Sequence, residues 1–194
     1  MFKKILIAAL MVASFSFAQI NFGVHAAANM STLWGDDAEN AETGIGFSAG
    51  LGMKISLPLL PITVAPEVLI DMRNMTDDND ATLTEWALEV PVLVRLSLLP
   101  ILYVEAGPTF ALNLSVSGED DDGNEVEFND DYFNTFEFGL AFGVGTGIVP
   151  FVDIDFRVNL GLTNMVADIE NPLGKDVEVN AKNLQFALGA TYWF

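Results

Sequence analysis

The sequence predicts an all-β fold: an eight-stranded antiparallel up-and-down transmembrane β-barrel with short periplasmic turns and long external loops. Three observations predict it: a period-two alternation with one apolar face, eight segments that carry it, and connections that alternate between short and long. The alternation is clearest in residues 43–55, TGIGFSAGLGMKI, where apolar side chains alternate with glycine, serine and lysine. Side chains alternate across a strand. Behind an export signal, this pattern indicates an apolar face toward lipid and a polar face toward a lumen.

The first 18 residues predict a secretory signal, which leaves residues 19–194 as one barrel domain. Lys3 and Lys4 form the positive region, residues 5–12 the apolar core, and Ser16-Phe17-Ala18 a cleavage site near Ala18. The apolar core is too short for a membrane helix, and no later segment approaches about 20 continuous apolar residues. The chain has no cysteine, which excludes disulfides, thiol chemistry and lipid attachment at cysteine.

The charge of the chain is strongly negative. It has 27 acidic and 8 basic residues, a net charge of −19, and removal of Lys3 and Lys4 leaves 6 basic residues and a charge of −21. Such a surface repels nucleic acid, so we expect no nucleic-acid partner. The chain is nevertheless 51% hydrophobic with a mean hydropathy of +0.38, unlike acidic disordered proteins. The charge must therefore be segregated from the apolar surface.

Eight segments show the alternation in turn. The predicted strands are residues 20–30, 43–55, 62–75, 85–98, 102–116, 135–148, 151–165 and 183–194. In strand order, representative outward residues are Phe22, Phe47, Val68, Val94, Phe110, Phe142, Phe156 and Leu188. Three strands contain a proline, at Pro66, Pro91 and Pro108, where a ladder donor is missing. We interpret these sites as bulges or locally broken pairing, and as the places where the register is least determined.

The connections between these strands fall into two classes. Residues 56–61, 99–101 and 149–150 are short, whereas residues 31–42, 76–84, 117–134 and 166–182 are long and carry 19 acidic residues. The other eight acids all fall on inward faces: Glu67, Asp71, Glu85, Glu89, Glu105, Glu137, Asp153 and Asp155. A charge facing lipid at mid-depth costs about 2–4 kcal/mol. The sorting of loops and charges thus favours an outer-membrane barrel over its structural rival, a soluble lipocalin-type barrel.

Several stretches resemble a known family. They are residues 89–95, 103–108, 143–145 and 157–164 and the terminal Tyr192-Trp193-Phe194. On these stretches the whole mature chain resembles the small outer-membrane β-barrel proteins of the OmpX/OmpA-transmembrane-domain type, "outer membrane protein beta-barrel domain" or porin-family proteins. The resemblance implies a monomer in the bacterial outer membrane, with the lipid bilayer and lipopolysaccharide as partners. The closing Phe194 looks like the terminal signal read by the barrel-assembly machinery.

The inward faces contain a candidate charge network. Its members are Glu67, Asp71, Arg73, Glu89, Arg95, Glu105, Asp153, Asp155 and Arg157. About a tight turn at residues 99–101, Arg95 and Glu105 face each other. About the turn at residues 149–150, Asp153 and Asp155 lie opposite Gly145 and Gly143. Because an eight-stranded barrel is just wide enough for side chains to fill, we expect a salt-bridged plug. A narrow ion path or proton-linked pore is the alternative.

No catalytic constellation stands out. Hydrolysis by a Ser–His–acid triad needs a histidine general base, and the only histidine, His25, lies mid-strand on an inward face. We expect it to bond a lumen carboxylate. The predicted function is therefore non-enzymatic, with no cofactor: envelope integrity or surface interaction through the acidic loops. A small-solute or ion pore and an outer-membrane lipid-modifying enzyme are the alternatives.

The loop at residues 117–134 is the one candidate metal site. Asp120, Asp121, Asp122 and Glu125 supply the oxygens that calcium takes as ligands. The EF-hand pattern fails, because Gly118 stands where an acid is required. Weak calcium bridging, shared with lipopolysaccharide phosphates, is one interpretation, and a solvated acidic loop is the favoured one.

Overall fold

The computed structural model describes residues 19–35, 41–58, 60–77, 82–119, 125–127, 134–164, 169–170, 176–177 and 181–194. Eight long strands make up most of this part: β1 (Gln19–Trp34), β2 (Ala41–Ser56), β3 (Ile62–Asp77), β4 (Thr82–Leu99), β5 (Leu102–Glu119), β7 (Phe136–Val149), β8 (Val152–Gly161) and β11 (Lys182–Trp193). Three short strands accompany them: β6 (Glu125–Glu127), β9 (Ile169–Glu170) and β10 (Asp176–Val177). No helix in the described ranges is long and apolar enough to span a membrane.

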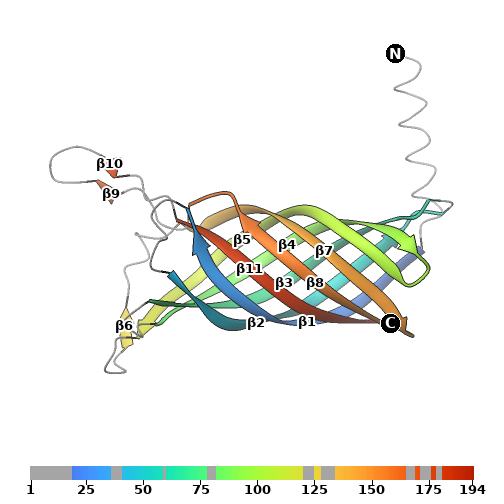
Figure 1. Cartoon of the computed structure of the whole chain (residues 1–194), viewed down its shortest axis with the longest axis horizontal. Helices are drawn as coiled ribbons and strands as arrows, with labels where there is room; N and C mark the ends of the chain where they lie inside the picture. The colour runs from blue at the N-terminus through green and yellow to red at the C-terminus, as the bar shows by residue number, and fades with distance from the viewer. Residues whose placement is uncertain are drawn as a thin grey trace, which may run out of the picture.

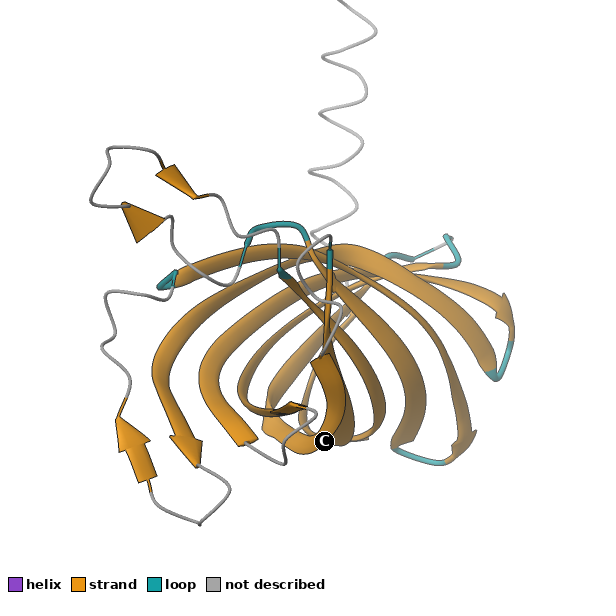
Figure 2. Ribbon diagram, turned by 60° about the vertical axis from the view of Figure 1, so that its left-hand side comes forward, coloured by secondary structure: helices purple, strands orange, loops and turns teal. Residues whose placement is uncertain are grey.

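The eight long strands form a closed barrel. They are hydrogen-bonded in the order β4-β3-β2-β1-β11-β8-β7-β5, and β4 also pairs with β5. Every pairing is antiparallel, and the first and last strands join along a register from Gly23↔Trp193 to Trp34↔Lys182. Figures 1 and 2 show the strands curving around a common interior. The predicted fold class is confirmed.

The two ends of the barrel differ. The C-terminus lies at the end that carries the short turns, and β6, β9 and β10 lie beyond the opposite end (Figure 1). Most strands continue further toward this loop end than predicted. The largest extensions are those of β1, which reaches Trp34 by pairing with β11, of β4, which begins at Thr82, and of β5, which reaches Glu119 by pairing with β6. The strand predicted at residues 151–165 is shorter and ends at Gly161. It ends there because the next two N–H groups, of Leu162 and Thr163, both donate to the Phe138 carbonyl.

The barrel wall is apolar outside and polar inside. Large apolar side chains of every long strand are exposed on the outer face, among them Phe22 at 60%, Leu51 at 64% and Leu188 at 60%. The eight acids that the sequence assigns to inward faces all point inward as predicted. Seven of them are at most 6% exposed, and the side chain of Asp153 is 14% exposed. This is the polarity of a wall that faces hydrocarbon on its outer side.

The register at the prolines is simpler than predicted. The β3–β4 pairing is interrupted between Pro66 and Leu69, and the β4–β5 pairing between Pro91 and Val94. In both places the register is the same on the two sides, so pairing is locally broken without a bulge. The register shifts lie elsewhere, in β2 before Phe47, at two points of the β4–β5 pair and near the β7–β8 turn.

The turn between β7 and β8 corrects one prediction. Gly145 pairs with Asp155 and Gly143 with Arg157, so the predicted partners of Asp153 and Asp155 were wrong by two residues. The error arises because the turn is formed by Pro150 and Phe151, one residue later in the chain than predicted. Val149 then pairs with Val152 around Pro150 and Phe151, and Phe151 takes a left-handed φ of 64°. A two-residue error preserves the face, so both aspartates still point inward.

A charge on the outer wall should block assembly. Val94 is 48% exposed in the middle of the apolar face. We expect Val94→Arg to lower the yield of heat-modifiable barrel strongly, because an arginine facing hydrocarbon costs about 2–4 kcal/mol. The loop substitution Asp121→Arg is the control and should leave the yield unchanged. Equal yields from both variants would show that the outward assignment is wrong.

Candidate functional site: the charged lumen

Charged side chains fill the half of the lumen near the short turns. This turn-end cluster consists of Lys54, Glu67, Arg95, Glu105, Asp153, Asp155 and Arg157. Arg157 donates from Nη1 to Glu67 Oε2 at 2.6 Å and from Nε to Glu105 Oε1 at 2.7 Å. Arg95 donates from Nε to the other oxygen of Glu105 at 2.8 Å and from Nη1 to Asp153 Oδ2 at 3.1 Å. Glu105 thus joins the two guanidinium groups, and it faces Arg95 as predicted.

Aromatic side chains border the turn-end cluster on the side of the short turns. Trp193 donates from Nε1 to Asp153 Oδ2 at 2.7 Å, and the Lys54 ammonium lies 4.3 Å from the indole centroid. The Arg95 guanidinium lies 4.7 Å from the Tyr103 ring. Gly145 is required beside this ring, because a Cβ at that position would overlap Tyr103. A cavity of about 180 Å³ opens next to these groups and is lined by Lys54, Arg95, Tyr103 and Asp153, among others.

A second group of charges lies nearer the long loops. This loop-end cluster consists of Asp71, Arg73, Glu85, Glu89 and Glu137. Arg73 is its centre: Nε donates to Asp71 Oδ2 at 2.7 Å, and Nη1 donates to Glu137 Oε2 at 3.0 Å. Glu89 and Glu85 are further from the guanidinium, at 3.5 and 3.7 Å. Four carboxyl groups therefore surround one cation.

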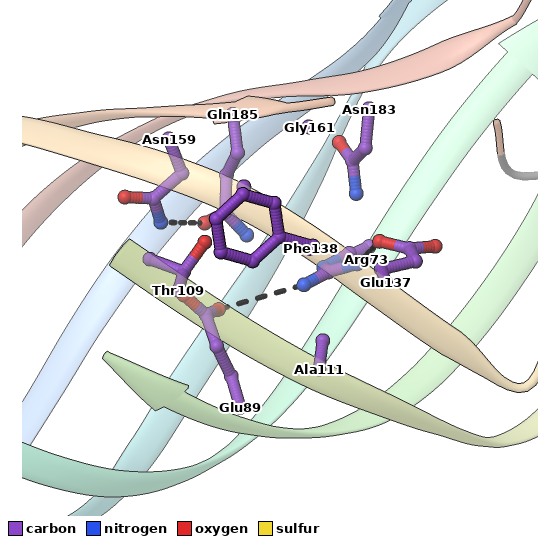
Figure 3. Close-up of a pocket in the computed structure, with 11 residues that line it drawn as sticks. Arg73, Glu89, Thr109, Ala111, Glu137, Phe138, Asn159, Gly161, Asn183 and Gln185 are labelled. Carbon is purple, nitrogen blue, oxygen red and sulfur yellow. Dashed lines mark hydrogen bonds and ion pairs between the residues drawn. The ribbon is translucent and has the colours of Figure 1, made fainter. Parts of the chain in front are cut away.

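Amide side chains complete the loop-end cluster. Asn29 donates to Asp71 at 2.8 Å, and Gln185 donates to both oxygens of the same carboxylate at 3.2 and 2.9 Å. Asn159 donates to Gln185 at 2.7 Å. A cavity of about 20 Å³, the space of one water molecule, lies among Arg73, Glu89, Asn159 and Gln185 (Figure 3).

The only histidine has a different partner from the one predicted. His25 is 3% exposed, and its Nδ1 lies 2.9 Å from the hydroxyl of Thr191 on the neighbouring strand β11. The prediction of a carboxylate partner was therefore wrong. Thr191 pairs directly with His25 in the β1–β11 register, so the nearest polar side chain on the same face satisfies the ring.

The predicted calcium ligands are not tested by the structure. Asp120, Asp121 and Asp122 lie outside the described residues, and Glu125 is described only as part of the backbone of β6. Within the described ranges, no three His, Cys, Asp or Glu side chains are grouped so as to hold a metal ion.

The structure brings all nine predicted network residues into the two clusters. It adds members that the sequence reasoning missed: Lys54, Glu85, Tyr103, Gln185 and Trp193. Each of them lies on an inward face of its strand, so the alternation alone could have found them. The missing information was which strands lie opposite one another across the lumen.

Comparison with known proteins identifies the fold and the family. The family described as "Outer membrane protein beta-barrel domain" matches residues 15–167. No curated protein matches the chain. The chain is similar in structure to Neisserial surface protein A (NspA), with 16% identity, 89% of this chain and 97% of that chain covered, and a TM-score of 0.55. It is also similar to a major outer membrane protein from Thermus thermophilus, with 17% identity, 91% and 100% coverage, and a TM-score of 0.52.

A third similar structure is that of Ail, the attachment invasion locus protein of Yersinia pestis, in complex with the heparin analogue sucrose octasulfate. The identity is 13%, the coverage is 91% of this chain and 99% of that chain, and the TM-score is 0.51. At these identities the three structures show the fold alone.

Loss of a central arginine should destabilise the barrel much more than loss of the peripheral lysine. We expect Arg157→Gln to lower the free energy of unfolding by about 3–5 kcal/mol, because it leaves buried carboxylates without their cation. Lys54→Gln is the matched control. Its side chain is 26% exposed and 3.6 Å from Asp153, so we expect a loss below about 1 kcal/mol. Urea unfolding in lipid vesicles measures both, and similar losses would show that the turn-end cluster is not a buried network.

Proposed function

Because the chain belongs to the outer membrane protein beta-barrel domain family, we propose that this integral outer-membrane β-barrel is a closed, non-enzymatic protein. Its role is to support the integrity of the envelope and to present acidic loops for interaction at the cell surface. The proposal has three parts: a lumen that does not conduct, a wall anchored in lipid, and loops that select cationic partners.

One observation carries the closed lumen: charged pairs tie opposite walls of the barrel together. In the ring of eight strands, β3 and β8 are separated by three strands on either side, so they lie diametrically opposite. Glu67 of β3 and Arg157 of β8 are nevertheless joined by two hydrogen bonds of 2.6 and 2.9 Å. Arg73 of β3 similarly reaches Glu137 of β7. Side chains that span the full width of the lumen support the proposal of a plugged interior, since the interior of an eight-stranded barrel is narrow enough for side chains to fill.

The position of His25 supports the absence of catalysis. A general base must reach its substrate. The imidazole is 3% exposed, faces the lumen in the middle of β1 and bonds Thr191. At this exposure the ring offers almost no surface to a lipid substrate at the outer wall or at the loop end.

The acidic loops determine the kind of partner that we propose. The four long connections contain 19 of the 27 acidic residues. The similar Ail structure is a complex with a sulfated heparin analogue. A polyanion of this kind would be repelled by the loops of this chain, so we propose cationic partners, including calcium held weakly between Asp120, Asp121, Asp122, Glu125 and lipopolysaccharide phosphates.

The outer wall and the terminus support the remaining partners. The exposed apolar side chains fit a lipid bilayer with lipopolysaccharide in its outer leaflet, and we propose a monomer in that membrane. Phe194 is 70% exposed, and its N–H donates to the Phe22 carbonyl at the β1–β11 seam. A terminal aromatic held outward at the closing seam is accessible to the barrel-assembly machinery before closure.

Single-channel recording tests the closed lumen. We expect the folded barrel to be silent in a planar bilayer, with or without calcium, because the pairs between β3 and β8 cross the bore. The double variant Glu67→Ala/Arg157→Ala removes one such tie without changing the net charge of the lumen and should show openings. A heat-dependent gel shift confirms folding of each sample. Steady, reproducible openings of the unmodified barrel would overturn the proposal in favour of a narrow pore.

A further inference from the structure

The loop-end cluster contains more negative charge than its cation neutralises. Among the described residues, Arg73 is the one cation in it, facing Asp71, Glu85, Glu89 and Glu137. With all four carboxyl groups ionised the formal charge is −3. The turn-end cluster, with four acids and three cations, reaches only −1. All five loop-end residues are at most 6% exposed. Because unpaired buried charge is strongly unfavourable, this cluster requires further positive charge.

The surroundings of Glu85 also indicate that the loop-end cluster lacks positive charge. Glu85 is 0% exposed, and neither of its carboxyl oxygens has a hydrogen-bond partner. Glu85 Oε2 and Glu137 Oε2 lie 3.7 and 3.0 Å from the same nitrogen, Nη1 of Arg73. Buried carboxyl groups that share one cation cannot all stay ionised at low cost unless a proton or another cation lies near them.

The cavity beside the cluster supplies an independent observation. It is lined by Glu89, Glu137, Arg73 and Asn183, and its 20 Å³ hold one particle the size of a water molecule (Figure 3). Asn183 is 6% exposed, and its Oδ1 has no hydrogen-bond partner among the described residues. A buried amide oxygen without a donor is uncommon in folded proteins. The oxygen is therefore placed to receive an O–H group or a metal ion held in the cavity.

We propose that the loop-end cluster binds a small monovalent cation from solvent: either a proton, or an alkali-metal ion held in the cavity by the two carboxyl groups and the amide oxygen that line it, those of Glu89, Glu137 and Asn183. Carboxylate and amide oxygens are ligands for hard cations, and the size of the cavity excludes organic cations. The charged or amide groups that face the site come from β1, β3, β4, β5, β7, β8 and β11: Asn29, Asp71, Arg73, Glu85, Glu89, Asn113, Glu137, Asn159, Asn183 and Gln185. This site does not require a closed lumen, so the conductance result does not decide it.

The thermal stability of the purified full barrel in detergent tests the proposal. The folded barrel holds a bound cation at this site, and the unfolded chain does not. In choline buffer the midpoint of the heat-dependent gel shift should therefore fall by about 3 °C or more as the pH rises from about 5, where carboxyl groups of the unfolded chain are becoming ionised, to about 9. Glu85→Gln removes one negative charge without removing a hydrogen bond, and it should reduce this fall. The loop variant Asp121→Asn is the control and should show the full dependence of the unmodified barrel.

Two further measurements distinguish the cations. A protonated-carboxyl band in the infrared spectrum at neutral pH, absent from Glu85→Gln, identifies a proton. A higher midpoint in sodium or potassium than in choline, without that band, identifies an alkali-metal ion. Should Glu85→Gln fail to fold, both measurements on the unmodified barrel still decide the matter. A barrel with no such infrared band, and with a midpoint that depends on neither pH nor cation, would overturn the proposal. So would an Asp121→Asn variant in which the pH dependence of the midpoint is reduced as much as in Glu85→Gln.

Discussion

The cost of placing a charge in hydrocarbon shapes the whole barrel. Strands alternate their side chains, so each strand has one face for lipid and one for the lumen. Since a charge on the lipid face costs about 2–4 kcal/mol at mid-depth, all eight strand acids lie on the lumen face. The lumen of eight strands is narrow, and these acids are therefore driven together and away from water. They are compatible with folding only because Arg73, Arg95 and Arg157 lie among them.

The same narrowness explains how the pairs reach across the bore. Arginine and glutamate are long enough to meet from opposite walls, as in the bonds between β3 and β8. Small residues make room for them: Ala65 and Ala141 are buried inward-facing positions near these chains, and Gly145 leaves space for the Tyr103 ring. Large and small inward residues are thus complementary, which is how a barrel of this width is filled without a continuous apolar core.

Much of this could be predicted from the sequence, because the alternation and the cost of exposed charge are local rules. They yielded the closed eight-stranded fold, the inward position of the eight acids assigned to inward faces and the pairing of Arg95 with Glu105 across a short turn. They failed where the register depended on the position of a turn, as for Asp155, whose partner is Gly145 because the β7–β8 turn lies one residue later than predicted. They also failed across the lumen. No sequence rule indicates that Arg157 meets Glu67, since the two residues are 90 positions apart and on opposite walls.

The closed lumen depends on that contact between opposite walls. A double-mutant cycle on Glu67→Gln and Arg157→Gln, measured by reversible unfolding in lipid vesicles, tests it most directly. If the two side chains are bonded across the lumen, each single variant is destabilised, and the two effects are non-additive by about 1 kcal/mol or more. Additive effects would mean that the two groups do not meet, and the plugged lumen would lose its central support.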